Sequence, residues 1–207
     1  MKPFLASVLL LLSVLPAHAQ TNQSLIAQTP EERIQLLQHI GGIYFQSGDH
    51  ANAIDAYQRI LEIDPEQKEA RSILGVIYVS VKNYEAAIEN MRRLTEDYPD
   101  DYQALNNLAW TYATAEDPAF RNAATAIDLA QQALVLAPYD HHVWSTLSEA
   151  YFVSGQYEKA NRAIQHLVKM ATTKKIKLTK DAVDTYNNQI RKCTRAIETE
   201  KLLSEDQ

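Results

Sequence analysis

Proline and glycine recur along this chain with one common spacing. Pro65 and Pro99 are 34 residues apart, and Gly41 and Gly75 are separated by the same step. A period this long, kept at several positions at once, is typical of stacked helix pairs rather than of one compact domain. The period therefore predicts an all-α fold, an α-solenoid of helix pairs.

The aligned sequence contains four copies of one pattern, at about residues 34–67, 68–101, 102–140 and 141–174. Apolar residues in each copy recur at steps of three and four, which places them on one face of a helix. Each copy therefore predicts two helices joined by a short turn. The third copy is longer than the others, and its extra residues fall within 114–122.

The first helices of the first two copies carry the same short motif. It reads Ile40-Gly41-Gly42-Ile43-Tyr44 in one copy and Leu74-Gly75-Val76-Ile77-Tyr78 in the other. This motif resembles the tetratricopeptide repeat family, and the resemblance covers roughly residues 32–174. The resemblance implies a right-handed α-solenoid. It implies that small residues let paired helices approach closely, while tyrosines fill the gaps between repeats. The residues assigned to this packing are Gly41, Tyr44, Ala53, Gly75, Tyr78, Ala87, Tyr112, Ala126, Tyr151 and Ala160.

Helix starts are indicated at two prolines. Thr29, Pro30 and Glu32 supply a capping hydroxyl, a proline at the first helical position and an early carboxylate. Asp64 and Pro65 predict the start of the next repeat by the same chemistry. The solenoid is therefore expected to occupy residues 29–174.

The first nineteen residues have the pattern of a cleaved secretory signal. Lys2 precedes an apolar run from Phe4 to Leu15, and Ala17-His18-Ala19 offers a cleavage site before Gln20. A retained amphipathic anchor is disfavoured, because no polar face interrupts the run. We expect a periplasmic or secreted chain with a flexible lead-in at 20–28, and no integral membrane span.

Residues 175–207 form a predicted capping helix whose charge differs from that of the repeats. Residues 20–168 hold ten Lys/Arg against twenty Asp/Glu, while 169–201 hold nine against four. Two interpretations stay open: weak contact with an anionic surface, or a solvated face whose lysines favour the end of the preceding helix. Nucleic acid is not an expected partner of an exported chain with net charge −6.

Cys193 is expected on the buried stripe of the predicted capping helix; a reactive thiol is the alternative.

The sequence contains none of the usual catalytic motifs for a nucleophile elbow, a zinc-binding helix, a phosphate loop or a redox cysteine pair. His141 and His142 are adjacent, so on a helix they point about 100° apart and do not chelate one ion. We therefore predict no enzymatic activity, no catalytic residue, no metal and no cofactor. Glu149 is interpreted as a polar group of a groove rather than as a general base.

The resemblance implies a concave groove lined by the first helix of each repeat. Amides in such a groove pair with an extended peptide backbone, and aromatic side chains supply affinity. For Trp110, packing against the loop at 115–119 is an equal alternative. The groove lacks the Lys and Arg that clamp a terminal carboxylate in some family members. The predicted groove residues are His39, Phe45, Ile73, Asn106, Asn107, Trp110, Thr146, Glu149 and Phe152.

Two functional hypotheses follow from these patterns. The first is an exported adaptor or scaffold that binds a protein or peptide segment in its groove, in envelope assembly or secretion. The second is a structural subunit of an oligomer that docks through its convex face or its basic cap. The sequence alone names no particular partner.

Overall fold

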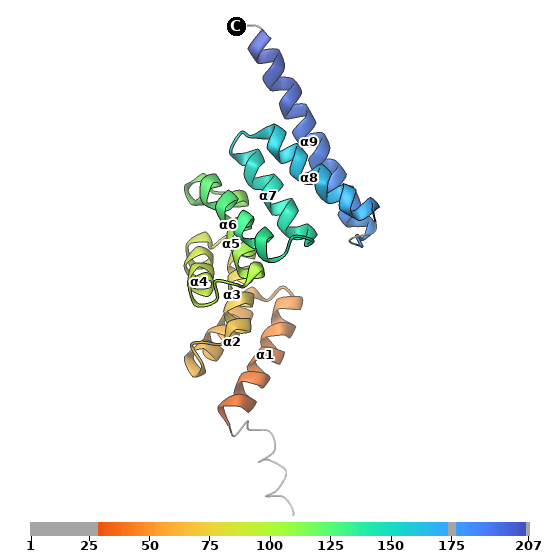
Figure 1. Ribbon diagram of the computed structural model, residues 1–207. Helices are drawn as coiled ribbons and strands as arrows, with labels where there is room; N and C mark the ends of the chain where they lie inside the picture. The colour runs from red at the N-terminus through yellow and green to blue at the C-terminus, as the bar shows by residue number, and fades with distance from the viewer. Residues whose placement is uncertain (1–28, 174–176, 206–207) are drawn as a thin grey trace, which may run out of the picture.

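A computed structural model describes residues 29–173 and 177–205, and within these ranges the chain contains helices and no strand. The helices stack in antiparallel pairs from α1 and α2 at one end to α7 and α8 at the other, and α9 covers that second end (Figure 1). The predicted all-α solenoid of four helix pairs with a capping helix is confirmed. The helices are α1 (Pro30–Gln46), α2 (His50–Ile63), α3 (Lys68–Ser80), α4 (Tyr84–Asp97), α5 (Tyr102–Thr114), α6 (Ala123–Leu136), α7 (His141–Val153), α8 (Tyr157–Thr172) and α9 (Lys180–Glu205).

The first helix begins as its sequence predicts. Thr29 Oγ1 accepts a hydrogen bond from the Glu32 amide at 3.1 Å, and the Glu32 carboxylate accepts one from the Thr29 amide at 3.0 Å. Pro30 occupies the first helical turn, where its missing N–H costs nothing. These contacts satisfy two amides that the helix itself leaves without a partner.

The predicted helix start at Asp64 and Pro65 is wrong. Asp64 ends α2 in an extended conformation, and α3 begins only at Lys68, with Gln67 as its capping residue. The cause is steric, because a residue that precedes proline is disfavoured in the helical region. Pro65 therefore follows a helix end and lies in the turn between repeats.

Small residues bring the paired helices together. A Cβ atom built on Gly41 would lie 3.0 Å from the Tyr57 ring in α2, and one built on Gly75 would lie 3.0 Å from Met91 in α4. In the fourth pair Ser148 takes this place, and its hydroxyl donates to the Ala160 carbonyl at 2.9 Å. The four predicted alanines of the second helices are completely buried: Ala53, Ala87, Ala126 and Ala160.

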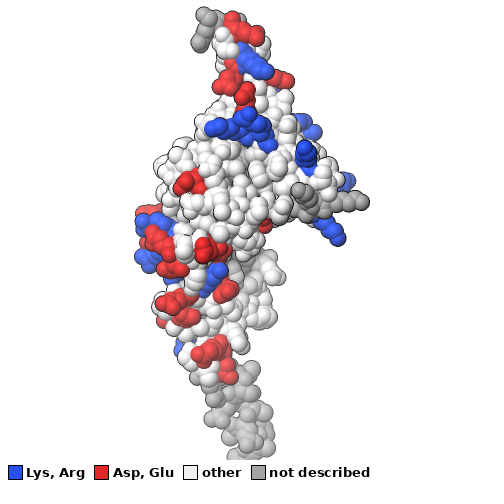
Figure 2. Space-filling view, viewed as in Figure 1, with Lys and Arg blue, Asp and Glu red and all other residues white. Residues whose placement is uncertain are grey.

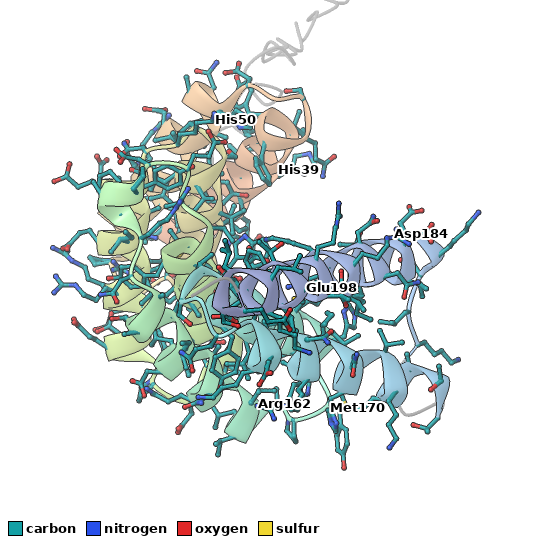
Figure 3. All side chains as sticks on the ribbon, turned by 90° about the horizontal axis from the view of Figure 1, so that it is seen from above. His39, His50, Arg162, Met170, Asp184 and Glu198 are labelled. Atoms are coloured by element: carbon teal, nitrogen blue, oxygen red, sulfur yellow. The ribbon has the colours of Figure 1, made fainter. Side chains whose placement is uncertain are left out.

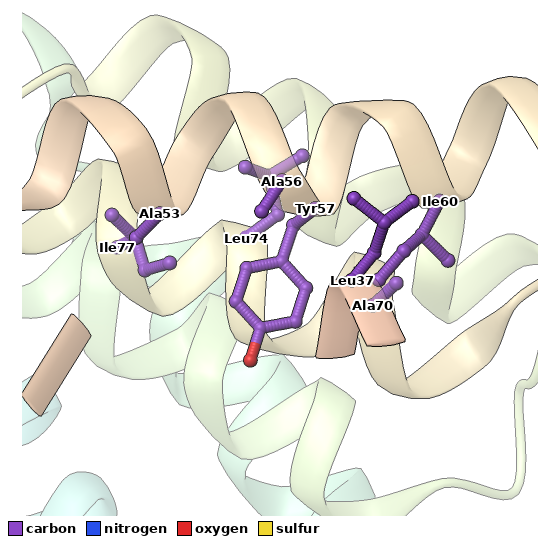
Figure 4. Close-up of a cluster of buried hydrophobic side chains, with 8 residues drawn as sticks. All are labelled: Leu37, Ala53, Ala56, Tyr57, Ile60, Ala70, Leu74 and Ile77. Atoms are coloured by element: carbon purple, nitrogen blue, oxygen red, sulfur yellow. The ribbon is translucent and has the colours of Figure 1, made fainter. Parts of the chain in front are cut away.

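Neighbouring repeats are joined by apolar clusters and by tyrosines. Figure 4 shows the first cluster, in which side chains of α1, α2 and α3 interlock, and Tyr44 packs against it. The Tyr78 hydroxyl accepts a hydrogen bond from Gln58 at 2.9 Å, and the Tyr151 hydroxyl accepts one from Gln131 at 3.0 Å. Each bond links a second helix to the first helix of the next repeat.

The longer third repeat places its extra residues between α5 and α6. They form a short 3-10 turn, Pro118–Phe120, and the Phe120 ring lies 5.8 Å from the Tyr84 ring of α4. The Tyr84 hydroxyl accepts a hydrogen bond from the Glu116 amide at 3.2 Å. The loop thus packs against the preceding repeat through Tyr84. Tyr112 packs against a separate cluster that joins α5, α6 and α7.

Candidate binding groove

The first helices of successive repeats line one face of the solenoid, and a hollow of about 680 Å³ lies on that face. Its walls come mainly from α5, α7 and α9, with a single contribution from α3. The lining residues are Ser72, Tyr102, Gln103, Asn106, Asn107, Trp110, Asp140, His142, Val143, Ser145, Thr146, Ala182, Thr185 and Tyr186. We refer to this hollow as the groove.

Four of the predicted groove residues meet in this hollow: Asn106, Asn107, Trp110 and Thr146. Trp110 is 41% exposed, so much of its ring is open to a ligand. Asn106 Oδ1 is buried and accepts no hydrogen bond within the described part of the chain. Thr146 is almost fully buried, and its hydroxyl donates to the His142 carbonyl of its own helix.

The structure places Glu149 and Phe152 under the capping helix rather than in the hollow. The Glu149 carboxylate accepts a hydrogen bond from Gln189 at 3.3 Å and pairs with Lys192 at 2.7 Å. The Lys192 ammonium also lies 3.9 Å from the centre of the Phe152 ring, in cation–π geometry. These two side chains therefore hold α9 in place.

The three remaining predicted residues lie toward the other end of the solenoid. His39 is exposed on α1. Figure 3 shows it apart from α9, the helix on which Asp184 and Glu198 are labelled. Phe45 and Ile73 are half-buried against the first apolar cluster, and the Phe45 ring lies 5.9 Å from that of His50. None of the three belongs to the lining of the groove.

Helix α9 forms one wall of the groove, which the sequence pattern did not predict. Tyr186 fixes that wall, because its hydroxyl lies 2.7 Å from His141 Nδ1. Burial lowers the pKa of His141, with the neighbouring His142 adding to the effect, and burial raises the pKa of Tyr186. Both groups therefore remain neutral near pH 7, and the bond joins two uncharged side chains. The sequence did offer one signal for this helix: Ala182-Val183 followed by Tyr186 imitates the arrangement of a small residue and a tyrosine in the earlier first helices.

Cys193 lies on the inner face of α9 and is completely buried. Burial raises the pKa of its thiol, which disfavours the reactive thiolate. This environment agrees with the interpretation of Cys193 as a small buried apolar residue.

Charge is divided along the solenoid as the sequence indicates. In Figure 2, Asp and Glu dominate the lower part of the molecule, and Lys and Arg gather around its upper part. In the described ranges, no helix is long and apolar enough to cross a membrane. Over the same residues, His, Cys, Asp and Glu form no group of three suited to a metal ion. The expectation that His141 and His142 point about 100° apart is wrong, because the centres of their rings lie 4.0 Å from each other.

Comparison with known proteins supports the fold. Residues 44–117 match the family model described as tetratricopeptide repeat. Superkiller protein 3 of Schizosaccharomyces pombe is 28% identical over 125 residues, which cover 59% of this chain and 9% of that protein. BBSome complex member BBS4 of Bos taurus is 26% identical over 121 residues, which cover 58% of this chain and 22% of that protein. The match thus spans less than a quarter of either relative.

Solved structures show the same arrangement of helices. MamA from Desulfovibrio magneticus RS-1 superimposes with a TM-score of 0.60 at 18% identity, covering 70% of this chain and 77% of that one. A mutant O-GlcNAc transferase of Thermobaculum terrenum gives a TM-score of 0.58 at 21% identity, covering 70% and 27%. At this level of identity the likeness concerns the fold.

Stacked helix pairs with a groove along their first helices define a helical-repeat solenoid. The Gly-x-x-Tyr motifs, the buried alanines and the match over residues 44–117 specify which kind. Residues 44–117 of the chain match the tetratricopeptide repeat family.

Proposed function

We propose that the chain is an exported scaffold that binds an extended protein segment in the groove, in envelope assembly or secretion. The proposal rests on two groups that line the same hollow. Asn106 Oδ1 is a buried acceptor without a hydrogen bond, and the ring of Trp110 is partly exposed. A peptide backbone supplies the missing N–H donor, and a side chain of the segment packs on the indole. An unpaired buried acceptor costs free energy that such a donor recovers.

The charges of the groove favour a segment bound through its backbone. No Lys or Arg is among the described residues that line it, and its one acid there, Asp140, accepts hydrogen bonds from the amides of His142 and Val143 as the cap of α7. With this carboxylate already occupied, the accessible polar groups are amides, hydroxyls and the imidazole of His142. Affinity should therefore depend little on salt concentration.

The indole of Trp110 is the expected anchor for a bound segment. We expect Trp110→Ala to weaken binding by roughly 30-fold, because aromatic anchors at the centre of an interface contribute about 2 kcal/mol or more. The measurement is a pulldown from envelope extract with the wild-type chain, followed by titration of each retained protein against the variant.

Leu203→Ala provides the control, because Leu203 is 63% exposed near the end of α9 and does not line the groove. This variant should retain the wild-type partners. Retention of the same proteins by Trp110→Ala with unchanged affinity would contradict the groove proposal. Thermal unfolding followed by circular dichroism should show both variants to be fully helical.

Export is a second part of the proposal and rests on residues 1–19, which lie outside the described residues, as does the lead-in at 20–28. We expect the chain expressed in a bacterial host to be cleaved after Ala19. Mass spectrometry of the purified protein should then find Gln20 at the amino terminus. A replacement of Ala17 and Ala19 by arginine should block the cleavage, and an uncleaved wild-type chain would argue against export.

A further inference from the structure

A second hollow lies away from the groove, between α7 and α8, and encloses about 340 Å³. We call it the outer crevice and define it by Trp144, Tyr151, Lys159, Arg162 and His166. Figure 3 places Arg162 on the side of α8 that is turned away from α9. The outer crevice therefore opens on a different face from the groove.

Two aromatic side chains form the floor of the outer crevice and are held rigidly. The Trp144 indole donates to the Pro138 carbonyl at 2.9 Å, and its ring lies 4.5 Å from that of His166. The Tyr151 hydroxyl accepts the bond from Gln131. Rings fixed in this way offer apolar surface to a ligand at little cost in entropy.

Lys159 and Arg162 form a cationic rim above this floor. Both are exposed, and neither belongs to an ion pair within residues 29–173 and 177–205. The Lys159 ammonium donates to Gln156 at 2.6 Å and lies 5.6 Å from the centre of the Tyr151 ring. No Asp or Glu is among the described residues that line the outer crevice.

The second repeat contains the equivalent crevice with different charges. Shifted back by two repeats, Lys159 corresponds to Ala86 and Arg162 to Glu89, and both of these line a hollow between α2, α3 and α4. Glu89 pairs there with Arg93 at 2.9 Å. The crevice of the second repeat thus contains a paired acid and base, whereas the crevice of the fourth repeat contains cations without an ion pair. Packing of the solenoid does not require the cations of the fourth repeat.

The outer crevice and its surroundings are also more apolar than the equivalent crevice of the second repeat. Val135 of α6 is 83% exposed and stands where Glu62 lines the crevice of the second repeat. Likewise, Trp144 stands where Arg71 lines that crevice. The fourth repeat thus combines an apolar floor with an uncompensated positive rim.

We propose that the outer crevice docks an acidic protein segment that carries an aromatic or aliphatic side chain. Carboxylates of the segment pair with Lys159 and Arg162, and the apolar side chain packs on Trp144 and Tyr151. Charge complementarity selects this partner, because the rim presents only cations, and the aromatic floor requires an apolar side chain between the acids. The site is independent of the groove and of its partner.

The test uses the full chain and a short fluorescein-labelled peptide of alternating glutamate and phenylalanine, followed by fluorescence anisotropy. The double variant K159A/R162E should weaken binding at least about tenfold, since it removes both attractive charges and adds a repulsive one. The reciprocal variant R71W/A86K/E89R transfers the indole of the floor together with the rim to the second repeat, where Tyr78 already stands in place of Tyr151, and it should add a second binding site. Binding should also weaken as salt rises.

Matched controls separate this site from general attraction to a basic surface. K201A/R195E makes the same change of net charge on α9 and should leave peptide binding unchanged. The same peptide with glutamine in place of glutamate should not bind. Equal losses in K159A/R162E and K201A/R195E, or no loss in K159A/R162E, would overturn the proposal. A third contradicting result would come from sedimentation equilibrium. If the wild-type chain self-associates and K159A/R162E abolishes this, the occupant of the outer crevice is a second copy of the chain.

Discussion

Replacing Gly41 by leucine should destabilise the solenoid by about 3 kcal/mol, a large share of the stability of a chain this size. The reason is the 3.0 Å separation between a Cβ at this position and the Tyr57 ring, with the Ala56 Cβ at 3.2 Å. Tyr57 is itself buried among the apolar side chains of the first cluster, so its ring can move only if that cluster repacks. Urea unfolding followed by far-UV circular dichroism measures the effect.

The adjacent glycine provides the matched control. A Cβ on Gly42 would meet only the Tyr57 hydroxyl, at 3.9 Å, which is ordinary van der Waals contact. Gly42→Ala should therefore stabilise the chain by up to about 1 kcal/mol, because alanine favours a helix over glycine. If both variants were equally stable, close approach of α1 and α2 would not be the function of Gly41.

The solenoid was predictable because each repeat solves the same packing problem with the same residue types. Ala53 and Ala160 are completely buried in equivalent second helices, although more than a hundred residues separate them. A recurrent small residue can be recognised without knowledge of any angle between helices. The exact helix start near Pro65 depends on local backbone sterics. The proline pattern predicted Asp64 as the capping residue, whereas Gln67 caps α3 in the structure.

The groove was predictable in part. Asn106, Asn107 and Trp110 lie on α5 in the middle of the array, where neighbouring first helices fix which face is open. Glu149 and Phe152 lie on α7, and their exposure depends on how the last helix crosses it. That crossing is set by contacts distant in sequence, such as the pair of Lys192 with Glu149. Periodicity does not report such contacts.

The same contacts make α9 the part of the molecule most open to a selective test. Tyr186 is buried against Ile164 and Leu167 of α8 and is bonded to His141. Tyr186→Ala should remove about 3–5 kcal/mol of packing. Because α9 packs only at the end of the array, this loss should release α9 while the four helix pairs remain folded.

Cys193 reports that release directly, since its thiol is completely buried on the inner face of α9 in the native chain. In Tyr186→Ala we expect dithiobis(nitrobenzoic acid) to react at least about tenfold faster than in the wild type, because local opening exposes the thiol. Tyr186→Phe keeps the ring and loses only the bond to His141, so its rate should rise much less. Wild-type protection of Cys193 in Tyr186→Ala would show that the other contacts of α9, among them those of Gln189 and Lys192 with α7, are sufficient to hold it. The groove would then keep its third wall without the tyrosine.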